Sequence, residues 1–110
     1  MMKIPTSAAA AGLLRALIAR SQASRDRILL SDFQSTEWQS LTLVGERHVI
    51  RFRLCGPDCD DIVANLTSGI EDAEFAIPNQ IVADIALIRT PERNADGSMT
   101  VELEALTIPE

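Results

Sequence analysis

The spacing of apolar positions changes along the chain and predicts its elements. Between Ala8 and Ser21 apolar residues recur every three or four positions, which indicates an amphipathic helix, and Thr6 or Ser7 can cap it. Its apolar face holds Ala10, Leu13, Leu14, Leu17 and Ile18. This face covers either the domain's own sheet or a second copy of the chain, and the sequence leaves both open.

Residues 27–54 are rich in apolar and β-forming side chains and predict extended strands. A strand over 27–34 precedes a hairpin whose arms are 37–44 and 47–54. Gly45-Glu46 separates the arms, and glycine first in a two-residue loop is typical of a type II′ turn. The sequence therefore predicts a tight hairpin turn at this dipeptide.

This turn determines which side chains share a face, because a one-residue slip inverts both faces. It places Leu41 opposite Ile50 and Trp38 opposite Arg53. The inward face would then hold Leu41, Leu43, Ile50, Phe52 and Leu54. The outward face would hold Thr42, Val49, Arg51 and Arg53. We expect His48 to be partly exposed near the end of the hairpin.

The second half of the chain predicts one more helix and at least two strands. Pro57 followed by acidic residues is typical of a helix start, since proline tolerates the first turn and carboxylates suit the positive end of the helix dipole. Gly69 can end this helix. Alternating apolar residues predict strands over 81–88 and over 99–108. In the first of these, Ile81 and Ile85 would point inward and Val82 outward, and the spacing of the isoleucines also permits a helix.

The order of these elements predicts one α+β domain over residues 1–110. A single antiparallel sheet of four to five strands would carry an N-terminal and a central helix on one face, an order that loosely resembles ferredoxin-like proteins. Residues 1–24 form an N-terminal helical segment that is available to pack on a partner. The expected core includes Leu41, Ile50, Phe52, Ile85 and Leu103.

Composition and charge narrow the class of protein. With 46% apolar and 24% charged residues, the chain has the composition of a soluble folded domain. The net charge of −6 argues against nucleic acid as the main partner, because phosphate binding needs a positive surface. No apolar run is long enough to span a membrane. Two cysteines only four positions apart do not form a disulfide framework, so we expect a cytoplasmic protein.

Cys55 and Cys59 are the most suggestive chemical pair, since they lie where a strand meets a helix. A helix N-terminus can activate a thiol, but the C-x-x-x-C spacing is one residue longer than the redox motif, and nearby acids oppose a thiolate. His48 precedes Cys55 by seven residues, about 23 Å along a strand, so a Cys–His site would need a histidine from another copy. The acids after Pro57 lack the pattern of a calcium loop. We therefore expect neither a metal nor a cofactor.

The remaining candidate is a surface. Tryptophan and arginine are enriched at binding hot spots, and the outward faces of the two halves carry opposite charges. The candidate surface consists of Trp38, Arg47, Arg51, Arg53, Asp84, Glu102 and Glu104. If the two hairpins are neighbours in the sheet, these charges pair across strands; if they are separated, the face is bipolar and two copies could pair as a dimer.

These observations favour a non-enzymatic protein-interaction or assembly module that forms homo-oligomers, with another protein as an alternative partner. Two alternatives stay open. One is a domain that binds or senses a small molecule in a pocket between sheet and helices. The other is a thiol enzyme that uses Cys55 or Cys59.

Overall fold

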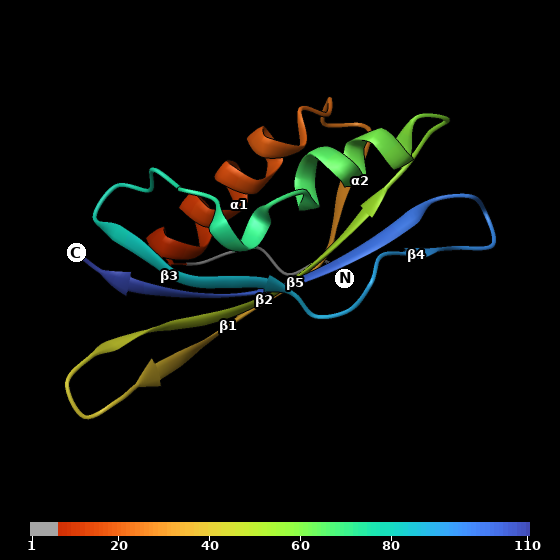
Figure 1. Ribbon diagram of the computed structural model, residues 1–110. Coiled ribbons are helices and arrows are strands. Elements are labelled where there is room, and N and C mark those ends of the chain that lie inside the picture. Colours follow the sequence, from red (N-terminus) through yellow and green to blue (C-terminus); the bar gives the residue numbers. More distant parts are fainter. Residues whose placement is uncertain (1–6) are drawn as a thin grey trace.

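A computed structural model describes residues 7–110 and shows an α+β fold with all of its strand pairs antiparallel. The elements are α1 (Ala8–Ser21), β1 (Ile28–Gln39), β2 (Val44–Leu54), α2 (Cys59–Thr67), a short 3₁₀ turn (Ile70–Asp72), β3 (Gln80–Leu87), β4 (Glu92–Arg93) and β5 (Met99–Pro109). The five-stranded sheet has the order β1-β2-β5-β3, and β4 pairs with β5. This architecture confirms the predicted fold class (Figure 1).

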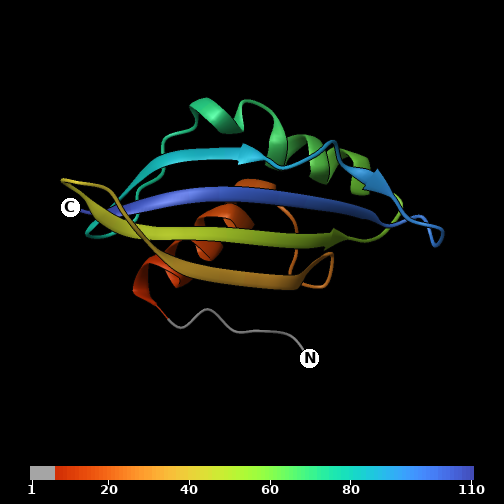
Figure 2. The ribbon, with the colours of Figure 1, turned by 90° about the horizontal axis from the view of Figure 1, so that it is seen from below.

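Both α-helices lie on one face of the sheet, and the other face is left uncovered (Figures 1 and 2). The core fills the space between the two layers. Four of the five predicted core residues are buried in it, namely Ile50, Phe52, Ile85 and Leu103. None of the helices in the part of the chain described here is both long and apolar enough to cross a membrane.

Helix α1 forms where its periodicity predicts it. Ser7 is the N-cap, and its side chain accepts a hydrogen bond from the Ala10 N–H at 3.0 Å. Leu13 and Leu17 are fully buried, so the helix covers the domain's own sheet. Gly12 gives close packing: a Cβ there would lie 2.6 Å from Cγ2 of Ile77.

The predicted turn at Gly45-Glu46 is wrong. Strand β1 continues to Gln39, and the chain turns at Ser40–Leu43, where the Ser40 N–H donates to the Leu43 carbonyl at 2.8 Å. The side chain of Ser40 also accepts from the Leu43 N–H at 3.1 Å. Residue 45 is glycine for a different reason: a Cβ there would overlap the carbonyl oxygen of Thr107 on β5.

The displaced turn changes the pairing of β1 but not the faces of β2. Ile50 lies opposite Phe33 instead of Leu41, and Leu41 is fully exposed at the tip of the hairpin. Trp38 lies opposite Gly45 instead of Arg53. Ile50, Phe52 and Leu54 are buried and point inward, as predicted, because the alternation along β2 itself is unchanged.

Strands β3 and β5 confirm the alternation predicted for the second half, with one exception. The register of β3 against β5 shifts between Val82 and Asp84, which marks a bulge at Ala83. The bulge turns Val82 toward the core and Ile81, which is 50% exposed, to the outward face, so the predicted orientations of both residues are wrong. On β5 the buried positions alternate without interruption.

Candidate interaction surface

The charged residues predicted for the outward face meet one another across two neighbouring strands. Strands β2 and β5 are adjacent, and Arg51 lies opposite Glu102. Arg51 Nε is 3.8 Å from Glu102 Oε1, and Arg89 Nε is 3.5 Å from the same oxygen. Arg47 forms an ion pair with Glu104. These charges therefore pair across neighbouring strands of one sheet, and the outward face is not bipolar.

Two predicted surface residues have other surroundings. Arg53 pairs with Asp96 in the turn before β5 and also donates from Nε to Ser98 Oγ at 2.9 Å. Asp84 is exposed on the edge strand β3 and has no ion-pair partner among residues 7–110. These contacts leave little uncompensated charge in the middle of the outward face.

An apolar row crosses all four main strands at one end of the outward face. Trp38 on β1 pairs with Gly45 on β2, and Ile108 on β5 pairs with Ile81 on β3. Gly45 and Ile108 are in contact range, since a Cβ on the glycine would lie 3.3 Å from Cγ1 of Ile108. Ile81 is 50% exposed. We call Trp38, Ile81, Leu106 and Ile108 the apolar end.

The turn that joins β1 to β2 exposes further apolar side chains. Leu41 is fully exposed, Val44 is 61% exposed and Leu43 is 47% exposed. Strand β2 pairs with β5 only from Glu46 onward, so the ribbon beyond this point has two strands. We call residues 37–46 the hairpin arm; it projects from the sheet on the side away from the helices (Figure 1).

His48 is buried, which corrects the prediction that it is partly exposed. Its Nδ1 lies 2.7 Å from Ser35 Oγ, and its Nε2 lies 2.8 Å from Thr107 Oγ1. The ring also meets Phe33 edge to face, with centroids 5.8 Å apart. Burial lowers the pKa of His48, and the nearby carboxylate of Glu46 opposes part of this shift.

The two thiols at the corner between β2 and α2 have different surroundings. Cys55 is half-buried, and Cys59 is buried with its thiol donating to the Gly97 carbonyl at 3.6 Å. Arg27 holds the same corner, donating from Nε to the Cys55 carbonyl at 2.6 Å and pairing with Asp58. No group of three or more potential metal ligands occurs within residues 7–110. Both thiols lie beyond the C-terminal end of β2, whereas the buried His48 lies in the first half of this strand.

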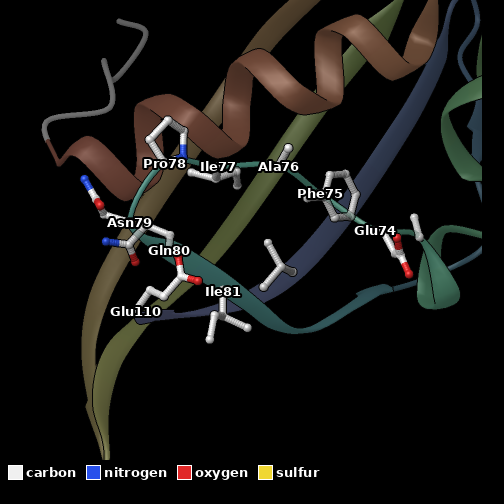
Figure 3. A pocket seen from close by; sticks show the side chains of 11 residues that line it. Glu74, Phe75, Ala76, Ile77, Pro78, Asn79, Gln80, Ile81 and Glu110 are labelled. Atoms are coloured by element: carbon white, nitrogen blue, oxygen red, sulfur yellow. The ribbon is translucent and has the colours of Figure 1, made fainter.

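An open hollow of 640 Å³ lies between the extended stretch before β3 and β3 itself. Figure 3 shows Phe75 and Ile77 on that stretch, with Ile81 on the strand and Glu110 beside it. A second hollow, of 480 Å³, surrounds the base of the hairpin arm and is lined by Ser7, Glu37, Trp38, Gln39, Val44, Gly45, Glu46, Gln80 and Pro109.

Comparison with known proteins adds information about the fold. No protein-family model and no curated protein matches the chain. A solved chain from a structure described as "Virion of native gene transfer agent (GTA) particle" is similar, with a TM-score of 0.68 and 10% sequence identity. The likeness covers 94% of this chain and 99% of that one, so the two share a fold over nearly their whole length.

Proposed function

We propose that the chain is a non-enzymatic structural subunit that assembles with copies of itself into a larger particle. The observation that carries this proposal is the likeness in fold to a virion chain, which extends over almost the whole of both chains. Fold alone does not fix function, so the proposal also needs a surface suited to assembly.

The outward sheet face supplies such a surface. No helix covers it, and its apolar end carries Trp38 beside Ile81 and Ile108. A buried tryptophan in an apolar surround is typical of binding hot spots. The neighbouring Arg47–Glu104 pair is already neutralised, so a second copy can approach without like-charge repulsion there.

The test compares Ile81 and Leu29, two outward residues of similar exposure. Ile81→Glu places a charge in the apolar end, and Leu29→Glu, at a residue 44% exposed on β1, places the same charge elsewhere on the face. Sedimentation velocity over a wide concentration range should show a self-associating wild type, weakened association for Ile81→Glu, and none of this loss for Leu29→Glu. A wild type that stays monomeric at the highest concentration contradicts the proposal.

Small-molecule binding is the second candidate. It is supported by the hollow beside Phe75 and Ile81, whose 640 Å³ falls within the usual size of ligand pockets. Thermal unfolding in the presence of a ligand panel would show a raised midpoint for any compound that binds the folded state. Thiol chemistry with a donated His48 is not proposed, because that ring is enclosed and both of its nitrogens are engaged.

A further inference from the structure

The hairpin arm has features that its own subunit does not account for. A two-stranded ribbon is only marginally stable in water, yet this one ends in three exposed apolar residues, Leu41, Leu43 and Val44. Single exposed leucines are ordinary, but an adjacent group at a projecting tip indicates contact with another surface.

The arm also carries uncompensated negative charge. Glu37 and Glu46 lie directly opposite each other on β1 and β2, and like charges in that position destabilise a strand pair. Neither has an ion-pair partner among residues 7–110. Both line the same hollow at the base of the arm as Val44, so charge and apolar surface occur together.

The complementary charge lies on helix α1. Six arginines of the described residues form ion pairs, and Arg20 donates to the carbonyl oxygens of Leu66 and Ser68. Arg15, exposed on α1, and Arg25, after its end, have no carboxylate partner within the described part of the chain. The surface of α1 around Arg15 is apolar: it carries the small side chains of Ala11, Ala16 and Ala19 and the half-exposed Leu14 and Ile18.

We infer that the hairpin arm of one copy docks on helix α1 of a second copy. Glu37 and Glu46 then face Arg15 of the neighbour, and Leu43 and Val44 cover the alanines beside it. Within one subunit the base of the arm lies beside the α1 N-cap, Ser7, and the rest of the arm projects away from the helix layer (Figure 1). This inference rests on the proposed function and identifies the contacting elements.

The contact joins two different surfaces, so it is head-to-tail. Every copy offers one arm and one helix, and such an interface extends to a ring or a filament instead of stopping at a pair. Association should therefore continue beyond dimers.

A charge exchange between the two surfaces tests the inference. The double variant Glu37→Arg with Glu46→Arg should weaken self-association by about tenfold or more, and so should Arg15→Glu alone. Each replaces an attraction between opposite charges across the contact with a repulsion between like charges. Combining all three changes should restore association toward the wild-type value. Glu71→Arg with Asp72→Arg is the control for the double arm variant, and Arg25→Glu is the control for Arg15→Glu. They make the same changes of charge away from the contact, and both should associate as the wild type does.

Sedimentation velocity measures association, and circular dichroism confirms that each variant is folded. Folded arm and helix variants that associate like the wild type, or a combined variant that stays as weak as its parents, overturn the inference. A loss caused by Arg25→Glu instead of Arg15→Glu does the same, because it places the contact off α1. If these variants assemble normally while Ile81→Glu does not, the arm contact is refuted and the proposed function stands. A monomeric wild type refutes both.

Discussion

Truncating two hydrophobic residues of the same hairpin, Phe52 and Leu41, should give opposite results. Phe52 is fully buried in β2, the strand between β1 and β5, where it lies opposite Leu30 and Val101. Its neighbours are tied by backbone ladders on both sides and cannot collapse into the space that alanine would leave. Leu41 is fully exposed at the tip.

The expected magnitudes follow from these positions. Phe52→Ala should lower the free energy of unfolding by about 3–5 kcal/mol, the usual cost of truncating a buried aromatic. For a domain of this size that corresponds to a melting temperature lowered by roughly 12–20 °C. Leu41→Ala should change the free energy of unfolding by no more than about 0.5 kcal/mol, as at most exposed positions.

The assay is chemical denaturation at a protein concentration low enough to keep self-association from adding to stability. Ile50→Val, a smaller truncation on the same buried face, should cost about 0.5–1.5 kcal/mol and calibrates the scale. A turn at Gly45-Glu46 would instead put Leu41 opposite Ile50 in the core. A cost of about 2–5 kcal/mol for Leu41→Ala would therefore refute the register described here.

Two further predictions concern the titratable and thiol groups. Because burial lowers the pKa of His48 below its ordinary 6.5, the unfolded chain binds a proton before the folded one as the pH falls. The stability that His48 contributes should be complete well above pH 6.5 and fall as the pH drops below that value, and denaturation of His48→Gln should lack this part of the pH dependence. Cys55→Ser should leave the free energy of unfolding nearly unchanged, while Cys59→Ser should lower it by about 1–3 kcal/mol through burial of a hydroxyl. Chemical denaturation measures both, and an equal loss of stability in the two variants would contradict this difference in burial.

The helices and the last two long strands could be predicted from the sequence because their apolar spacing has one cause, which is packing of these residues in the core. In α1 the residues at helical spacing, such as Leu13 and Leu17, are those that reach the core. Glycine 45 is ambiguous in a way that a spacing pattern cannot resolve. An absent side chain suits a tight turn and equally suits close approach of another strand, and here the carbonyl of Thr107 occupies the space.

The buried state of His48 was beyond prediction for a related reason. Its enclosure depends on Ser35 and Thr107, which lie on different strands and satisfy its two ring nitrogens. These three residues can be placed side by side only when β1, β2 and β5 are known to be neighbours, and a sequence does not give strand order. The bulge at Ala83, which turns Val82 inward, likewise has no signal in the alternation of β3.

Strand order also decides which surface residues are free to bind a partner. Because β2 and β5 are adjacent, Arg47 and Arg51 are occupied by Glu104 and Glu102 of the same subunit. Exposed pairs of this kind contribute only about 0.2–1 kcal/mol each, so breaking them for a partner costs little but also gains little. Specific recognition must then come from groups without an internal partner. In this chain those are the apolar end around Trp38 and the projecting hairpin arm, which is why both proposals rest on them instead of on the charged stripe.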